Sequence, residues 1–376
     1  MGRGGAVLSF WGLTRKSSQA VATVTGDFPV GHCDDTTFLP NDFEPVSTPP
    51  QDTVAEDVNA HSYWREILIN FCKKKSGVVS LFGIVVLVLL ALFGPVLSGY
   101  TYDAQLKGQE NMAPRVPVLE NIGIFDGSEV IHASTKEIVS NKYQALEGGA
   151  QVYHLFGTDS LGRDLFTRVC EGTRISLFIA LMAVFLDIVV GLTFGLISGY
   201  FGGWLDNIMQ RFIEIIYSIP DLVIITLFIV IFKPGLLSII LALMFTGWVG
   251  MSKLARAQVI KLKEQEFVLA ARTLGARDFY LIFKEILPSI FGEVLVMSLF
   301  SVPSAIFFEA FLSYIGIGIP MPLASLGSLI SDAYSSLLTH PYMVVYPATV
   351  MVLLMLFFNL FADGLRDAID PQTRDR

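Results

Sequence analysis

The stretch GTDSLGRD, Gly157–Asp164, has the spacing of a loop that binds nucleotide phosphates. That loop follows G-x-x-x-x-G-K-[ST], where the lysine reaches the phosphates and the hydroxyl holds Mg²⁺. Here Arg163 replaces the lysine and Asp164 replaces the hydroxyl residue. The serine-hydrolase pattern G-x-S-x-G and the zinc-peptidase pattern H-E-x-x-H do not occur either. The sequence therefore predicts no nucleotide site and no catalytic site in this chain.

The metal-binding and redox-active residue types are few. The chain has three cysteines and five histidines, and none of them has the spacing of a metal site or of a disulfide framework. We therefore expect no metal and no cofactor on this chain.

Two acidic residues, Asp187 and Glu309, interrupt long apolar runs. A charge in hydrocarbon costs about 2.5–3.5 kcal/mol on insertion scales, so such residues are candidates for function. Each could line a solute pathway or contact a partner subunit. The alternative for each is a buried polar contact with a neighbouring helix of the same chain.

The elements that hold these residues are membrane spans. Of the 376 residues, 53% are hydrophobic and only 16% are charged. A helix needs roughly 20 apolar residues to cross a bilayer, and the runs are continuous rather than alternating, which argues against a β-barrel. We predict an all-α integral membrane protein with six transmembrane helices, with Pro220 and Pro303 as kinks. The six runs are 76–98, 175–200, 215–232, 234–252, 291–315 and 341–362.

The placement of positive charge predicts the orientation. Seven Lys and Arg residues lie in the loop 252–288, whereas the loop 316–340 has none. Cytoplasmic loops carry the excess of Lys and Arg, so we expect the loop 252–288 and both termini in the cytoplasm.

The spans divide the chain into predicted regions. Residues 1–60 are rich in Gly, Ser, Thr, Pro and Asp and predict a disordered cytoplasmic tail, the alternative being a small regulatory or partner-binding element. The sequence gives no fold for the extracytoplasmic segment. The remaining regions are an interfacial helix with the first span (61–98), the extracytoplasmic segment (99–173), the main transmembrane domain (174–363) with the loop 253–288, and a cytoplasmic tail (364–376).

The loop contains two short amphipathic patterns separated by Gly275. Apolar residues recur at helical spacing over 260–274 and again over 279–286, which predicts two helices. Gly275 suits a left-handed turn between them, and Pro288 is expected to end the second helix. Such a pair could dock into a groove of a partner, or it could merely cover the ends of the spans. The residues of the two faces are Ile260, Phe267, Ala271 and Leu274, then Phe279, Ile282, Phe283 and Ile286.

The stretch EFVLAARTLGARDFYLIFKEILPSI, residues 266–290, resembles the coupling loop, or EAA motif, of the permease subunits of bacterial ABC importers. Leu269 stands at the acidic position of the motif and Glu285 at its isoleucine position. The residues that match are Ala270, Ala271, Gly275, Leu287 and Pro288.

Four further stretches resemble the C-type permease of the dipeptide, oligopeptide and nickel branch of that family, in collinear order. Leu326 stands where the family often has tryptophan. The stretches are FGTDSLGRDLFTRVCEGTRISL, ISGYFGGWLDNIMQRFIEIIYSIPDL, FFEAFLSYIGIGIPMPLASLGSLI and FNLFADGLRDAIDP.

The resemblance implies a type I importer permease fold in the bacterial plasma membrane. It implies a second homologous permease, two cytoplasmic ATPases that hold the ATP and magnesium, an extracytoplasmic binding protein, a peptide substrate and surrounding lipid, and no nucleic acid. The implied ATPase-facing residues are Glu266, Ala270, Ala271, Arg272, Thr273, Leu274, Gly275, Ala276, Arg277 and Asp278.

Other functions stay open at this point. Within the family, nickel, glutathione or another small solute could replace the peptide. A secondary transporter or a membrane scaffold would be a different class, but the inverted repeats and paired midplane charges of a secondary transporter are not visible.

Overall fold

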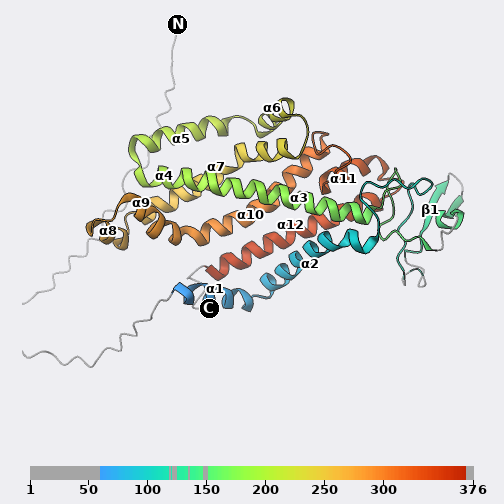
Figure 1. Ribbon diagram of the computed structural model, residues 1–376, viewed down its shortest axis with the longest axis horizontal. Coiled ribbons are helices and arrows are strands. Elements are labelled where there is room, and N and C mark those ends of the chain that lie inside the picture. The colour runs from blue at the N-terminus through green and yellow to red at the C-terminus, as the bar shows by residue number, and fades with distance from the viewer. Residues whose placement is uncertain (1–59, 118–119, 121–124, 134–135, 147–150, 370–376) are drawn as a thin grey trace, which may run out of the picture. The chain divides into compact units, whose positions relative to one another are not determined.

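The computed structural model of the protein describes residues 60–117, 120, 125–133, 136–146 and 151–369 (Figure 1). The tail predicted over 1–60 therefore lies outside the described residues except for its last residue. Of the predicted tail 364–376, residues 364–369 belong to the last helix, and the others lie outside the described residues.

Within the described residues, five helical stretches are long and apolar enough to cross a membrane, and one bent helix pair forms a sixth candidate span. This agrees with the predicted number. The first span is α2 (Lys75–Ser98), and the second consists of α3 (Leu165–Asp187), the π-helical η5 (Ile188–Leu192) and α4 (Thr193–Phe201). The third is the bent pair α5 (Gly203–Ser218) and α6 (Asp221–Phe232), and the fourth is α7 (Leu236–Leu262). The fifth consists of α9 (Asp278–Tyr280), the π-helical η6 (Leu281–Ile286) and α10 (Leu287–Tyr314), and the sixth is α12 (Tyr342–Ile369).

The third span differs from the prediction of one helix kinked at Pro220. Helix α5 ends at Ser218 and α6 begins at Asp221, and the two are bent by 81°. Ile219 between them is extended, with φ −88° and ψ 126°. A residue before proline avoids the helical region because of the clash with the proline ring, so the chain breaks here instead of kinking.

The second span begins earlier than predicted, at Leu165 rather than Ile175. The Asp164 carboxylate accepts a hydrogen bond from the Thr167 N–H at 2.8 Å and caps the first turn of α3. Asp159 accepts from Arg163 at 2.7 Å and from Arg168 at 2.6 Å. The acidic and basic residues of the stretch that resembles a phosphate loop therefore start a helix and pair with each other.

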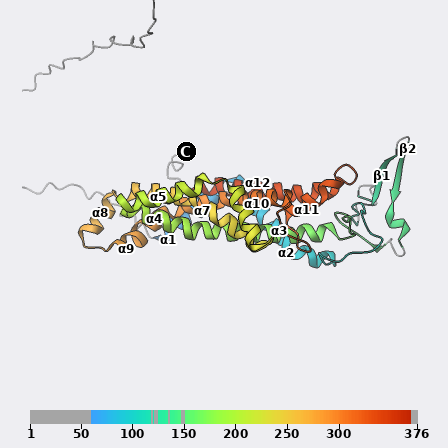
Figure 2. The same cartoon turned by 90° about the horizontal axis from the view of Figure 1, so that it is seen from above.

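The segment between α2 and α3 contains the one sheet among the described residues, so the chain is mostly rather than entirely helical. Strands β1 (Ser128–Ala133) and β2 (Lys136–Asn141) pair antiparallel, followed by a 3₁₀ turn, η3 (Lys142–Ala145). The Arg115 guanidinium lies over the rings of Tyr143, at 5.1 Å, and Tyr153, at 4.7 Å. Figure 2 shows the hairpin at the opposite end of the long helices from α8 and α9.

Two shorter helices pack against the ends of the spans. Helix α1 (Ala60–Lys73) buries Ile67 and Phe71 against Ala368 of α12, and the Lys74 ammonium pairs with the Asp367 carboxylate. Helix α11 (Leu326–Ala333), followed by the 3₁₀ turn η7 (Tyr334–Ser336), packs on α10 and α12.

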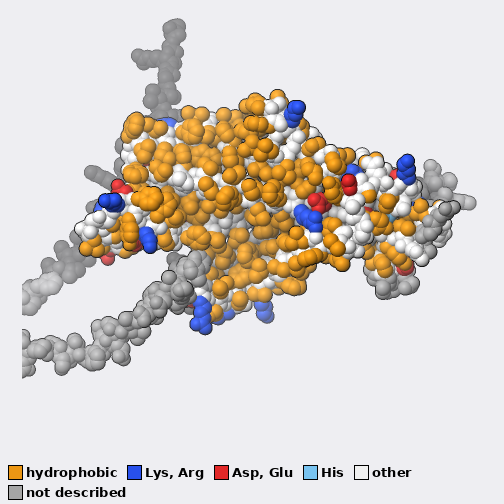
Figure 3. Space-filling model, in the orientation of Figure 1, with side chains coloured by type: hydrophobic (Ala, Val, Ile, Leu, Met, Phe, Trp, Pro, Cys, Tyr) orange, Lys and Arg blue, Asp and Glu red, His pale blue; other side chains and the backbone are white. Residues whose placement is uncertain are grey.

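The core lies between the long helices, and the outer surface is apolar. Ile179 of α3, Ile239 of α7 and Ile306 of α10 are completely buried in the main hydrophobic cluster. Figure 3 shows hydrophobic side chains over most of the face formed by these helices, with most Lys and Arg side chains at its margins. Such a surface suits lipid, which can satisfy no exposed polar group.

Candidate functional site

The loop between α7 and α10 is built around a short helix, α8 (Glu266–Thr273). We call residues 263–280 the α8 loop. The single helix predicted over 260–274 is wrong, because α7 ends at Leu262 and Gln265 is extended. Val259 and Val268 are both completely buried in one cluster. They stand about two and a half turns apart at 3.6 residues per turn, so in a straight helix they would face opposite sides. The break at 263–265 lets both reach the same core.

The turn after α8 has the left-handed conformation predicted for Gly275, whose φ is +86°. The Gly275 N–H donates to the Arg272 carbonyl at 3.0 Å, and the Ala276 N–H donates to the Ala271 carbonyl at 3.1 Å. This pair of hydrogen bonds is the Schellman motif, which satisfies the last carbonyls of a helix. The direction of the chain after α8 is therefore determined by one backbone conformation.

The helix after the turn does not end at Pro288, contrary to the prediction. It is continuous from Asp278 to Tyr314 and contains the π-helical turn Leu281–Ile286 just before the proline. A proline inside a helix clashes with the carbonyl four residues earlier, here Lys284, which belongs to that wider turn. The α8 loop is thus joined to α10 without a break.

Half of the eight residues of the apolar face predicted for the loop are exposed. Of that face, Ile282 and Ile286 are buried, and the completely buried Val268 and Leu281 were not predicted. Leu274 is 88% exposed. The exposed large apolar and aromatic side chains of the loop, together with Phe283 of η6, form what we call the apolar surface of the loop. They are Phe267, Leu269, Leu274, Phe279, Tyr280 and Phe283.

A groove lies beside this surface. It has a volume of about 520 Å³ and includes Gly275 and Arg277 in its lining. Leu274 and Tyr280 belong both to the groove and to the apolar surface. An exposed apolar surface beside a groove is typical of a protein interaction site.

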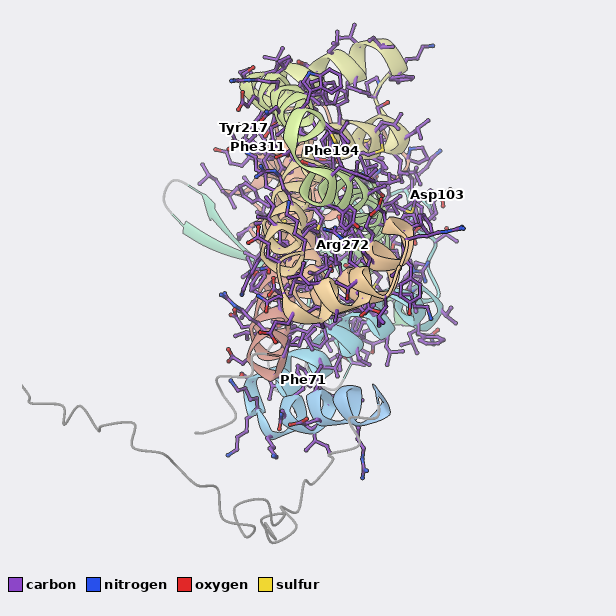
Figure 4. The ribbon with its side chains drawn as sticks, turned by 90° about the vertical axis from the view of Figure 1, so that its left-hand side faces the viewer. Phe71, Asp103, Phe194, Tyr217, Arg272 and Phe311 are labelled. Carbon is purple, nitrogen blue, oxygen red and sulfur yellow. The ribbon has the colours of Figure 1, made fainter. Side chains whose placement is uncertain are left out.

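The ten predicted partner-facing residues, 266 and 270–278, all lie in the α8 loop and are exposed or half-buried. Arg272 is labelled in Figure 4, which looks onto this end of the helices. No observation tests their predicted contacts with a partner.

Tyr200, which sequence reasoning missed, fastens the loop to the end of α4. Its hydroxyl donates to the Asp278 carboxylate at 2.6 Å and accepts a hydrogen bond from the Arg272 guanidinium at 3.2 Å. That hydrogen bond from Arg272 raises the pKa of its guanidinium above the ordinary value. Lys263 adds a hydrogen bond to the Gly199 carbonyl at 3.0 Å. The only signal in the sequence was a tyrosine just before a break, Gly202 and Gly203.

The two predicted membrane acids lie away from the loop. Glu309 is completely buried near the other end of α10, where its carboxylate accepts hydrogen bonds from Ser176 at 3.0 Å, Ser313 at 2.9 Å and Ser325 at 2.5 Å. These bonds join α3, α10 and the start of α11. Asp187 lies at the end of α3 and lines a cavity between helices. The predicted pathway or partner contact of either acid stays a prediction.

The chain is similar to known transport proteins over nearly its whole length. Residues 191–375 match the family described as "Binding-protein-dependent transport system inner membrane component", and residues 62–114 match the "N-terminal TM domain of oligopeptide transport permease C". The oligopeptide transport system permease protein OppC of Bacillus subtilis is 38% identical over 334 residues, 89% of this chain and 98% of that protein. The dipeptide transport system permease protein DppC of the same organism is 37% identical over 83% of this chain and 87% of its own length.

Among solved structures, a chain of the MetNI methionine ABC transporter in an inward-facing conformation matches 54% of this chain and 96% of its own length. It is 17% identical to this chain, with a TM-score of 0.45.

The membrane spans and the match to a family of transport components define this chain as a multi-pass inner-membrane protein of the transport class. The chain belongs to the family of binding-protein-dependent transport system inner membrane components, in its oligopeptide and dipeptide permease C branch. It is the permease part of an ABC importer, so an ATPase and a solute-binding protein are its partners. It is a transport subunit and not an enzyme.

Proposed function

We propose that this chain forms half of a membrane pathway for the ATP-driven uptake of di- or oligopeptides. The other half is a second, homologous permease, and two ATPase subunits hold the ATP and Mg²⁺. The peptide assignment is supported by the relatives that are 37–38% identical, which are named for oligopeptide and dipeptide transport. The two termini and the α8 loop are cytoplasmic, in keeping with the excess of Lys and Arg in the loop.

The observation that carries the coupling role is the apolar surface of the α8 loop. Contact of such an apolar surface with water is unfavourable, and an ATPase cleft that receives α8 would bury the surface. The lining of the groove includes Ala271, Gly275 and Ala276, whose small side chains let a partner approach the backbone closely.

The loop is also connected firmly enough to transmit movement. It joins α7 through one short turn, continues into α10 as one helix, and is bonded to α4 through Tyr200. A displacement of α8 by the ATPase would therefore move three spans together, which is how a small shift at one site is converted into a rigid-body change at another.

Photo-crosslinking tests the docking. A photoreactive amino acid placed at Leu274, which is 88% exposed, should crosslink to the ATPase in the assembled transporter. The matched control is Leu338, which is 97% exposed and lies just before α12, at the other end of the helices. We expect an ATPase product from position 274 and none from position 338. No product from position 274, or equal products from both positions, would reject the docking role.

A further inference from the structure

A cavity inside the helix bundle is not accounted for by the coupling loop. It has a volume of about 200 Å³ and is lined by residues of α3, α5, α6, α7 and α10. Tyr217, Asp221 and Ser304, all exposed, stand on its open side. Asp187 belongs to its buried part. The cavity is smaller than the roughly 300–1,000 Å³ of sites that enclose a whole ligand, so it suits one functional group of a larger solute.

Asp187 is a buried acid in the wall of this cavity. The residue is only 9% exposed, and its Oδ1 atom accepts no hydrogen bond within the described structure. Buried polar groups nearly always have partners, and a charge within a span is costly. The presence of an acid in this cavity therefore points to a ligand that comes from outside the chain.

The backbone around Asp187 is shaped to make room for the carboxylate. The π-helical turn Ile188–Leu192 begins immediately after it, and π-turns inside helices are frequent at functional sites. On the facing helix α7, a Cβ atom at Gly247 would lie 2.6 Å from both carboxylate oxygens. Any larger residue at Gly247 would thus displace the acid from its position.

The other polar groups of the cavity offer acceptors. The Ser301 hydroxyl donates to the Met297 carbonyl at 3.1 Å and the Ser304 hydroxyl to the Phe300 carbonyl at 3.4 Å, so both present oxygen lone pairs outward. Among the described residues that line the cavity, none is Lys, Arg or His. The ammonium of Lys253 lies 4.3 Å from the centre of the Tyr217 ring, at the open side.

A carboxylate with surrounding acceptors and no cation in the lining is complementary to a group that carries a positive charge and several N–H donors. A primary ammonium has three such donors. We propose that Asp187 binds the protonated amino group of a peptide as it passes through the membrane part of the transporter. The inference rests on the proposed function, because that function supplies the peptide.

The Asp187→Asn variant tests the inference by uptake. Asparagine keeps the size of the side chain and removes its charge. In vesicles with the complete transporter, we expect uptake of labelled tri-alanine to fall about tenfold, equivalent to roughly 1.4 kcal/mol, while ATP hydrolysis stimulated by the loaded binding protein is retained. The matched control is Glu214→Gln, an exposed acid of α5 outside the cavity, which should transport like the wild type.

Each outcome of the uptake experiment has one meaning. If the wild type takes up no peptide with ATP, the proposed function fails. If the wild type is active and Asp187→Asn equals it, only the role of Asp187 fails. If the variant loses the second permease during purification, the carboxylate belongs to the contact between permeases, and the inference is again rejected.

A second measurement uses the unaltered side chain. A hydrophobic carbodiimide adds to protonated carboxyl groups, and mass spectrometry locates the adduct. In the purified transporter without binding protein, excess tri-alanine should slow the labelling of Asp187, whereas N-acetyl tri-alanine, which lacks the ammonium, should not. Equal protection by both peptides would overturn the proposal.

Discussion

Replacing Gly275 by valine is expected to abolish ATP-driven uptake by the assembled transporter. Gly275 has φ +86°, and a residue with a Cβ atom pays about 1–2 kcal/mol in the left-handed region. A branched side chain is the least suited to it. Nothing lies within 4 Å of a Cβ added at this position, so the effect comes from the backbone and not from a clash. The Schellman turn opens and α8 loses its direction relative to α10.

The matched control at this position is Gly275→Asn. Asparagine tolerates the left-handed region and also ends helices in this way, so this variant should keep most of the uptake. Uptake is measured in reconstituted vesicles, with the binding of loaded binding protein as the check that the membrane part is folded. Wild-type uptake by Gly275→Val would refute the role of the α8 loop as a lever.

Replacing Arg256 by methionine is expected to destabilise the membrane part. Arg256 of α7 forms two hydrogen bonds to the Asp206 carboxylate of α5, at 2.7 and 2.6 Å, and the Ser198 hydroxyl of α4 contacts the same carboxylate. The side chains of Arg256 and Asp206 are 31% and 11% exposed. Without Arg256 the carboxylate stays buried and unpaired. We expect a loss of about 2 kcal/mol, between the values for surface and fully buried ion pairs.

The double variant Asp206→Asn with Arg256→Met separates charge from packing. It removes the unpaired charge, so its midpoint of thermal unfolding in detergent should recover most of the loss of the single variant. Equal midpoints for the single and double variants would show that the charge pair contributes nothing and that Arg256 acts through packing alone.

The membrane spans could be predicted from the sequence because lipid imposes length and continuous apolarity on them. Hydropathy does not show where a helix breaks inside an apolar run. Ile219 and Pro220 form such a break, and α6 after it is strongly apolar, whereas α5 before it carries Asp206, Arg211 and Glu214. The early start of α3 was readable in principle from Asp164 and Thr167, but these residues fall in a polar stretch that a search for apolar runs excludes.

The candidate site could be predicted where a backbone conformation favours a particular residue type. It could not be predicted where the structure depends on packing between distant residues. Gly275 could be assigned to a left-handed turn because few residues adopt one. The break at 263–265 arises because Val259 and Val268 share one core, which is a tertiary constraint. Pro288 was misread because the π-turn that accommodates it has no recognised sequence pattern. Tyr200 lies far from the loop in the sequence, so its bond to Asp278 could be found only from the structure.

The most direct test of the central claim is ATP-driven uptake. The complete transporter is reconstituted in vesicles and offered labelled di- to oligopeptides, with and without ATP and with and without the binding protein. We predict accumulation only when ATP and the binding protein are both present, and its loss in Gly275→Val. Uptake that proceeds equally without ATP would contradict the account.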